Sequence, residues 1–257
     1  MSPSSPVPAS DKVLLITGAG RGIGAATARL AAQAGWDVAV NYSRDIDAAS
    51  RVADAVRACG RRAITVRADV ADERAVQAMF ARIDVELGRL GALVNNAGIV
   101  ARRSRLDEMV VARWRHMFEV NVLGTMLCTQ AAVRRMSTLH GGRGGAIVNL
   151  SSMAAVLGAP AMYVDYAASK GAIDSFTVGM ARELATEGVR VNGVRPGIID
   201  TGIHADSGEP ERAQRSASVI PMQRPGRAEE VAEAIVWLIS PQASYTTGTL
   251  LDVSGGR

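Results

Sequence analysis

The most constraining feature of this chain is a regular alternation of short apolar runs with longer segments of helical periodicity. The apolar runs are continuous in hydrophobicity, which is typical of strands buried on both faces of a parallel sheet. The seven expected strands are Val13–Thr17, Asp37–Tyr42, Ala63–Arg67, Ala92–Asn95, Ala146–Leu150, Val189–Val194 and Thr249–Val253. The six expected helices are Ile23–Gln33, Ala48–Ala58, Arg74–Leu87, Arg113–Met136, Tyr166–Thr186 and Ala228–Ile239. Such an alternation predicts the α/β class: a doubly wound, Rossmann-type parallel seven-stranded sheet with helices on both faces.

The same pattern predicts the domain organisation. Glycines fall where four of the helices should end, at Gly35, Gly60, Gly88 and Gly188. No linker interrupts the alternation, so we expect a single domain over residues 12–257. Residues 1–11 are rich in proline and serine without the apolar core of a signal peptide, and we expect a flexible tail there. The segment 198–227 lacks periodicity, and we expect it to form a functional lid over a substrate.

Composition narrows the classes of function. The net charge of +4 is modest and the arginines are dispersed along the chain, which argues against a nucleic-acid partner. Cys59 and Cys128 stand alone and the three histidines are far apart, so we expect no metal site. No apolar run approaches the ~20 residues of a membrane span. We therefore expect a soluble cytoplasmic protein.

A glycine-rich turn follows the first expected strand and opens the first expected helix. It reads Thr17-Gly-Ala-Gly-Arg-Gly-Ile-Gly24. Glycines let the backbone approach a pyrophosphate closely, and the helix N-terminus supplies free N–H groups and a positive dipole end. With a strand before it and a helix after it, the turn predicts dinucleotide binding. The candidate contacts are Gly18, Arg21, Gly22, Ile23 and Gly24.

The end of the second strand indicates which dinucleotide. A carboxylate there would bind the ribose 2′-hydroxyl of NAD. The chain instead continues Tyr42-Ser43-Arg44, and the guanidinium groups of Arg21 and Arg44 are suited to a 2′-phosphate. This favours NADP, with Ser43 beside the phosphate, although Asp45 nearby keeps NAD possible.

A tyrosine and a lysine stand four residues apart at Tyr166 and Lys170. The chain has only one other lysine, Lys12, among its 29 basic residues. On a helix the two side chains share a face. An ammonium ~4 Å away favours a phenolate by about 4 kcal/mol at an effective dielectric of ~20, so we expect a lowered tyrosine pKa and a general acid–base. The spacing alone also fits an ordinary helix with a half-buried tyrosine and a surface lysine.

Three motifs occur in order along the chain: the glycine turn, Asn95-Asn-Ala-Gly98, and Tyr166-x-x-x-Lys170. Together they resemble the short-chain dehydrogenase/reductase family from about residue 12 to residue 256. The resemblance implies that Tyr166 is the catalytic acid–base and that Lys170 lowers its pKa and holds the nicotinamide ribose.

The resemblance assigns further roles. Ser152 would steady the substrate oxygen, with Ser151 as the alternative, and Asn121 would hold a water that relays protons to Lys170. The interval from Ser152 to Tyr166 is one residue longer than the commonest family spacing, with the extra residue expected in Ala159–Asp165. The remaining cofactor contacts implied are Asp69 and Val70 at the adenine, Asn95, Ala97 and Gly98 at the adenosine and ribose, and Pro196, Gly197, Ile199 and Thr201 beside the nicotinamide.

The resemblance implies the interconversion of a carbonyl and a secondary alcohol on a small molecule, for which we expect NADP as cofactor. It also implies a homotetramer whose interface includes the helices starting near Arg113 and Tyr166. An NAD-dependent dehydrogenase of sugars or alcohols is one alternative, and a non-catalytic dinucleotide-binding sensor is another. The expected lid fits a polar sugar, a keto ester or a 3-oxoacyl thioester equally well. Its polar residues are His204, Asp206, Glu209, Glu211, Arg212 and Arg215.

Overall fold

A computed structural model of the protein describes residues 12–202, 208–209 and 211–257. The predicted tail at residues 1–11 lies outside the described residues, as do His204 and Asp206 of the predicted lid. Among the residues described, no helix is both long enough and apolar enough to cross a bilayer.

A single sheet of seven parallel strands forms the centre of the molecule, as predicted. The strand order is β3-β2-β1-β4-β5-β6-β7. The bounds are β1 Val13–Ile16, β2 Asp37–Tyr42, β3 Ala63–Arg67, β4 Leu90–Asn95, β5 Gly145–Leu150, β6 Val189–Pro196 and β7 Leu250–Val253. The chain reverses its direction of travel across the sheet between β1 and β4. In a doubly wound sheet, ligands bind outside the carboxyl ends of the strands at this switch point.

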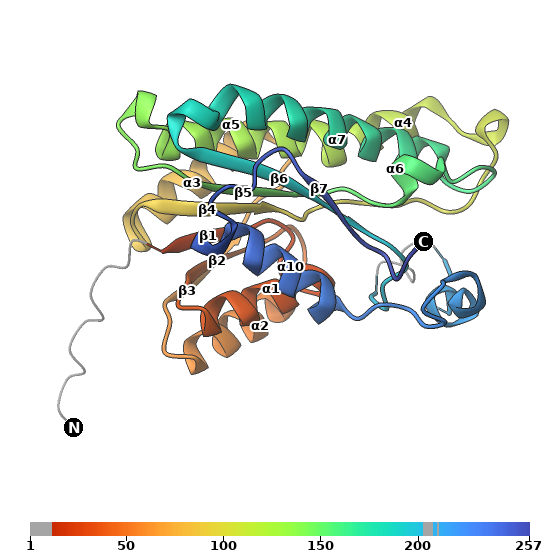
Figure 1. Ribbon diagram of the computed structural model, residues 1–257, viewed down its shortest axis with the longest axis horizontal. Helices are drawn as coiled ribbons and strands as arrows, with labels where there is room; N and C mark the ends of the chain where they lie inside the picture. The colour runs from red at the N-terminus through yellow and green to blue at the C-terminus, as the bar shows by residue number, and fades with distance from the viewer. Residues whose placement is uncertain (1–11, 203–207, 210) are drawn as a thin grey trace.

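Helices cover both faces of the sheet (Figure 1). One layer, which shares a buried apolar cluster with alternate residues of β1, β2 and β4, consists of α1 Gly22–Gln33, α2 Ile46–Ala58 and α10 Ala228–Ile239. The other layer packs on the opposite face and contains α3 Glu73–Glu86, α5 Gly124–Met136 and α7 Val164–Leu184. Consecutive residues of β1, β2 and β4 point into different clusters, so both faces of these central strands are buried.

Capping residues explain two of the differences between predicted and observed helix bounds. The α2 helix begins at Ile46, earlier than predicted, because the Asp45 side chain accepts a hydrogen bond from Ala48 N at 2.9 Å. Asp72 caps α3 in the same way. The four predicted helix-ending glycines are confirmed, since Gly35, Gly60, Gly88 and Gly188 all have left-handed φ angles between +72° and +99°.

The predicted continuous helix Arg113–Met136 is wrong in its middle. The structure has α4 at Val111–Phe118, a π-helical turn η2 at Glu119–Leu123, and then α5. Gly124 N donates to Glu119 O across this turn, one residue further back than in an α-helix. Glycine is required at position 124 because a Cβ would lie 2.7 Å from Val70 Cγ2.

The segment 198–227 is less irregular than predicted. Its described part contains the short helix α9 Arg212–Arg215 and the 3₁₀ turn η5 Ala217–Val219. Its two ends are joined by a parallel bridge between Ile199 and Gly226. Figure 1 shows these turns in light blue beyond the carboxyl end of β6, close to the C-terminal residues. A second short helix, α6 Ala154–Leu157, was also not predicted, because four residues are too few to show a period.

Candidate active site

The carboxyl ends of the central strands surround a cavity of about 170 Å³. Its wall is formed by the glycine turn, the loop after β4, the ends of β5 and β6, α6 and α7, the segment 198–227 and the C-terminal residue. Its main lining residues are Ile23, Asn96, Gly98, Val100, Ser151, Ser152, Met153, Leu157, Met162, Tyr163, Tyr166, Lys170, Pro196, Gly197, Ile199, Thr201, Arg212 and Arg257. The fold therefore brings together the three motifs that are far apart in the sequence.

The glycine turn is held tightly against the end of β4. Gly18 has a φ of +61°, and a Cβ there would lie 3.0 Å from Ala97 Cα. At Gly24 a Cβ would lie 2.6 Å from Asn96 Nδ2 and 2.9 Å from Gly18 O. Because neither position leaves room for a side chain, the N-terminus of α1 opens directly onto the cavity and fits the pyrophosphate of a dinucleotide.

Two neighbouring asparagines at the end of β4 have different hydrogen-bond partners. Asn96 Nδ2 donates to Thr17 O at 2.8 Å and to Gly18 O at 3.0 Å, so this side chain fixes the glycine turn. Asn95 is buried and donates to Thr129 Oγ1 at 3.0 Å and to Asn149 Oδ1 at 2.9 Å. Asn95 therefore braces the sheet, while Asn96 is the one of the two that lines the cavity.

The end of β2 lies where the adenosine ribose of a dinucleotide is expected. Ser43 and Arg44 are exposed there. The carboxylate of Asp45 caps α2 and so is committed to the helix N-terminus. Arg67, which the sequence analysis did not select, donates to Ser43 O at 3.3 Å and supports this loop. The Arg21 side chain extends in another direction: a Cβ on Gly202 would lie 3.7 Å from Arg21 Nη1.

The predicted adenine contacts differ in exposure. Asp69 is exposed after β3, and its Oδ1 accepts a hydrogen bond from Ala71 N at 3.0 Å. Val70 is buried against the start of α5 at Gly124. Only Asp69 of this pair presents its side chain to solvent.

The predicted nicotinamide contacts follow β6. Gly197 N donates to Val253 O at 2.9 Å, and a Cβ at position 197 would lie 2.7 Å from Ser254 Cα. Thr201 approaches the glycine turn, since a Cβ on Gly22 would lie 3.5 Å from the Thr201 side chain. The beginning of the segment 198–227 thus closes one side of the same cavity.

Tyr166 and Lys170 lie on one face of α7, as predicted. Lys170 Nζ lies 5.7 Å from the centroid of the Tyr166 ring and donates to Leu150 O at 2.6 Å. Lys170 is only 4% exposed, and burial lowers its pKa to about 8 against the opposing charge of Asp174. The surface-lysine alternative is therefore wrong.

The prediction that the pKa of Tyr166 is lowered is wrong for the protein without a bound cofactor. Burial raises the pKa of Tyr166, although a hydrogen bond with Ser152 and the positive charge of Arg212 both act to lower it. The prediction placed the ammonium ~4 Å away and subtracted nothing for desolvation. In the structure the Tyr166 side chain is partly buried, burial disfavours its charged form, and the ammonium is partly satisfied by a carbonyl.

The two adjacent serines have different partners. Ser151 Oγ donates to the main-chain oxygen of Lys170 at 3.2 Å and is buried. Ser152 shares a hydrogen bond with Tyr166, and its Oγ also accepts from Ala154 N at 3.1 Å at the start of α6. Ser152 is therefore the serine that stands beside the phenol.

Asn121 connects the loop after β4 to α7 from inside the π-helical turn. Its Oδ1 accepts from Ile99 N at 2.8 Å, and its Nδ2 donates to Ser169 Oγ at 3.1 Å. Ser169 Oγ in turn donates to Tyr166 O at 2.7 Å. A Cβ on Gly98 would lie 3.4 Å from Asn121 Oδ1 and 3.5 Å from Lys170 Nζ, so these two polar groups border one small space.

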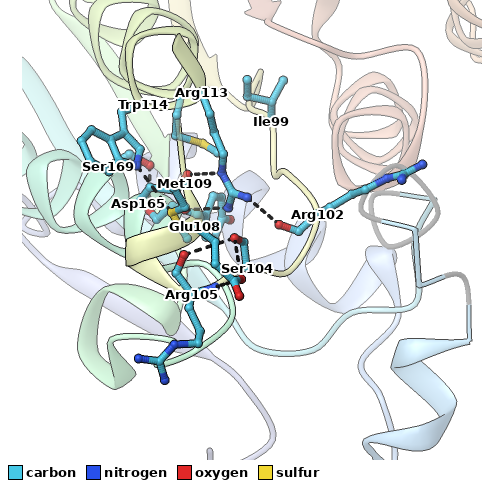
Figure 2. A network of polar contacts seen from close by, with 12 residues as sticks. Ile99, Arg102, Ser104, Arg105, Glu108, Met109, Arg113, Trp114, Asp165 and Ser169 are labelled. Atoms are coloured by element: carbon cyan, nitrogen blue, oxygen red, sulfur yellow. Dashed lines mark hydrogen bonds and ion pairs between the residues drawn. The ribbon is translucent and has the colours of Figure 1, made fainter. Parts of the chain in front are cut away.

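A buried ion pair fixes the neighbouring loop (Figure 2). Arg113 donates to both carboxylate oxygens of Asp165, at 2.7 and 3.0 Å, and to Arg102 O at 2.7 Å. Asp165 directly precedes Tyr166 on α7. Arg113 therefore faces inward and clamps the loop after β4 onto the helix that carries the tyrosine.

The chain before Tyr166 has an unusual backbone. Ala159 and Ala161 have left-handed φ angles of +44° and +55°, which non-glycine residues rarely adopt. Both lie in the region where the sequence analysis expected one extra residue. The tight turn brings Met162 and Tyr163 into the cavity wall.

Comparisons with known proteins agree with this geometry. A family described as enoyl-(acyl carrier protein) reductase matches residues 18–257. Over 245 residues the chain is 51% identical to an uncharacterized oxidoreductase of Escherichia coli (strain K12), YgfF, with 95% of this chain and 99% of that protein covered. It is 42% identical to cis-4-hydroxycyclohexanecarboxylate dehydrogenase of Sinomonas cyclohexanicum, with 96% of each chain covered.

A solved structure shows a similar fold. It is a short-chain type dehydrogenase/reductase from Mycobacterium marinum, which superposes with a TM-score of 0.89 at 36% identity and covers 96% of each chain.

Proposed function

The chain belongs to the short-chain dehydrogenase/reductase family, an oxidoreductase family that acts on CH–OH groups with NAD(P), and we propose that it reduces a carbonyl with NADPH and Tyr166 as proton donor. The observation that carries the proposal is the convergence of Ser152, Tyr166 and Lys170 on one cavity that the glycine turn also borders.

The roles of the chain's own side chains follow from their surroundings. The raised pKa keeps the Tyr166 phenol protonated at neutral pH, which suits proton donation to a carbonyl oxygen. Ser152, beside the phenol, donates a second hydrogen bond to the same oxygen. In the reverse direction the phenol must first lose its proton, so alcohol oxidation should need a higher pH than reduction.

The lysine and the asparagine support proton supply. Lys170 orients the nicotinamide ribose and returns a proton to Tyr166, and Asn121 borders the space through which a water reaches Lys170. Arg113 holds α7 against the loop after β4, because it bonds to Asp165 on the helix and to Arg102 O in the loop.

NADP is the cofactor that the described residues favour. The glycine turn leaves the space that a pyrophosphate needs, and when bound the cofactor supplies the hydride. At the ribose end Arg44 is exposed, and the neighbouring carboxylate of Asp45 caps α2 by accepting a hydrogen bond from Ala48 N. We propose that the other residues selected from the sequence for the adenine, ribose and nicotinamide also contact the cofactor. Asn95 would contribute indirectly, because its side chain is hydrogen-bonded within the sheet.

We further propose that the segment 198–227 is a lid. Its ends are fastened at the Ile199–Gly226 bridge, and its start reaches the glycine turn through Thr201. Closing it over the cavity would exclude water from the reacting atoms.

A homotetramer is also part of the proposal. Large apolar side chains are exposed on α4 and the turn that follows, among them Val111 at 51% and Leu123 at 45%. Exposed apolar residues grouped in this way are typical of subunit contacts. Analytical ultracentrifugation measures the mass directly, and a monomeric species at micromolar concentration would contradict the proposal.

The deciding experiment is a panel of aliphatic and alicyclic ketones, keto esters and sugars assayed with NADPH and with NADH. We expect ketone reduction with NADPH at least tenfold more efficient than with NADH. An NADH preference would support the NAD-dependent sugar or alcohol dehydrogenase. Tight NADPH binding without turnover of any compound would support the non-catalytic sensor.

A further inference from the structure

We infer that the substrate carries an oxyanion, a carboxylate or a phosphate, which binds to Arg212 and Arg257 at the outer end of the cavity. This inference rests on the proposed reductase function and names the class of substrate for the same site. It starts from the two side chains themselves, because both line the inner cavity that contains Tyr166 and also a second, outer cavity that adjoins it.

The two arginines are placed by packing. Ala213, next to Arg212 on α9, is fully buried with Ile198 and Ile220. The C-terminal residues pack on the same segment: Met222 N donates to Gly255 O at 3.1 Å, and a Cβ on Gly255 would lie 2.9 Å from Ile220 Cγ2. Two segments far apart in the sequence therefore bring their arginines to one place.

Aromatic stacking fixes the direction of one arginine. The Arg212 guanidinium carbon lies 4.9 Å from the centroid of the Tyr163 ring. Tyr163 is buried in the cavity wall, three residues before Tyr166. The guanidinium therefore stands above the wall of the site and is not extended into solvent.

The charge of this cluster is unbalanced. Among the described residues that line the outer cavity there are four arginine side chains and one side-chain carboxylate, Glu209, which also interacts electrostatically with Arg212. Glu209 is already paired with Arg103 at 3.3 Å and Arg215 at 3.4 Å, and it accepts a hydrogen bond from Tyr163 at 3.1 Å. Neither Arg212 nor Arg257 forms an ion pair within the described part of the chain.

Electrostatics adds a second observation. Burial, and then the charge of Arg212, lower the pKa of Arg257. Two partly buried guanidinium groups that repel each other are stabilised by an anion between them. A guanidinium presents paired N–H donors that match the oxygens of a carboxylate or phosphate.

The cavity lining between Tyr166 and Arg212 indicates what connects the carbonyl and the oxyanion of the substrate. Met153, Leu157 and Met162 line the inner cavity beside Ser152 and Tyr166. A carbonyl at Tyr166 and an oxyanion at Arg212 are thus separated by an apolar wall. The substrate class is an oxo acid, or an oxo phosphate ester, with an aliphatic or alicyclic body between its two polar ends.

The test compares matched charged and neutral ketones in the whole enzyme with NADPH. The carboxylate probes are 4-oxopentanoate, 5-oxohexanoate and 6-oxoheptanoate, and each is compared with its methyl ester. The phosphate arm uses 5-hydroxy-2-pentanone phosphate against the free keto alcohol. We expect kcat/KM for the best anion to exceed that of its neutral partner at least tenfold, and whichever arm shows the larger ratio identifies the oxyanion.

Variants separate an anion site from a structural role. Arg212→Gln and Arg257→Gln should each lower kcat/KM for the preferred anion about tenfold or more, and that for its neutral partner less than threefold. Arg212→Lys should recover part of the loss because it keeps the charge. The matched control is Arg215→Gln, on the same short helix but paired with Glu209, which should lower both values less than threefold.

Two results would overturn the inference. One is equal or better turnover of the neutral ketones by the wild-type enzyme. The other is an equal loss for both members of each pair in Arg212→Gln, which would assign Arg212 to packing alone.

Calorimetry separates this inference from the proposed function. If no ketone is reduced at all, the proposed function fails. Titration of 5-oxohexanoate and its methyl ester into the enzyme–NADP⁺ complex then still decides the anion site. Binding of the acid that is lost in Arg212→Gln supports the site, and equal or absent binding of acid and ester in the wild type rejects it.

Discussion

The floor and the outer end of the cavity are built in different ways. The floor carries Ser152 on the loop after β5 and Tyr166 and Lys170 on α7, and buried hydrogen bonds such as Lys170 Nζ to Leu150 O hold it in place. The outer end carries Arg212 and Arg257 on segments that pack through a few small contacts. The lysine of the floor is almost fully buried, whereas the arginines outside are partly exposed.

This difference matches the two roles that we propose, proton transfer at the floor and substrate recognition at the outer end. The groups that we propose to transfer the proton stand on a helix that packs on the sheet, and Lys170 Nζ donates to the last residue of β5. A group that only recognises one end of a substrate can stand on a loop, where sequence changes cost the core little. The comparison predicts that substitutions in the floor act on kcat, and that substitutions at the outer end act on the choice of substrate.

Replacing one of two tyrosines tests this contrast most strongly. Tyr166→Phe should lower kcat for ketone reduction by about 10³-fold, within the range that a general acid contributes. NADPH binding, followed by fluorescence, should be unchanged. Tyr163→Phe, one helical turn earlier, removes a hydrogen bond to Glu209 and should lower kcat less than tenfold. Similar losses in the two variants would erase the distinction between floor and outer end.

Exchanging lysine for arginine tests the floor from a second direction. Lys170→Arg should lower kcat/KM by about 10²-fold, because a planar fork cannot occupy the small space between Leu150 O and Gly98. Circular dichroism and thermal unfolding serve to show that the variant is folded. An active, folded Lys170→Arg enzyme would remove Lys170 from the mechanism.

The adjacent serines provide a smaller contrast within the floor. Ser152→Ala should lower kcat between tenfold and about 10²-fold, through the loss of a hydrogen bond to a developing charge. Ser151→Ala should change kcat less than threefold and lower the stability by about 1 kcal/mol, because it loses a bond to Lys170 O. Steady-state kinetics of the two variants decides which serine is catalytic, and a reversed order of losses would assign the role to Ser151.

The last expected effect is on stability at alkaline pH. The folded-state pKa of Lys170 is about 8, below its ordinary value of 10.5, so between these values the unfolded chain binds more protons than the folded one. The contribution of Lys170 to the free energy of unfolding should therefore rise as the pH increases from 8 to 10.5. Urea unfolding of the wild type and Lys170→Met should show a difference that changes in this direction, and a constant difference would contradict the buried ammonium.

The sequence predicted which strands and turns meet at the floor because these parts obey local rules, and the catalytic roles of its side chains stay predictions. Strands buried on both faces, glycines at helix ends and a tyrosine four residues before a lysine are visible without long-range information. The parallel topology then brings the strand ends together. The π-turn at Asn121 escaped prediction because five residues of altered hydrogen bonding leave the apolar spacing almost unchanged.

The outer end could not be predicted for a different reason. Arg212 and Arg257 meet only because residues 220–222 pack on the C-terminal glycines, and no periodic pattern records that contact. The direction of the Tyr166 pKa shift was missed because desolvation depends on the packed surroundings of the phenol, which a spacing cannot reveal.

The scarcity of lysine has a practical consequence for work with this protein. Lys12 is exposed just before β1, at the amino ends of the parallel strands and so at the opposite end from the cavity, and Lys170 is buried in the floor. Acylating reagents select primary amines and leave guanidinium groups intact. A dye or a solid support coupled through the Lys12 side chain would therefore attach the protein by the side remote from its reaction centre, and the arginines that we propose to recognise the substrate would remain unmodified.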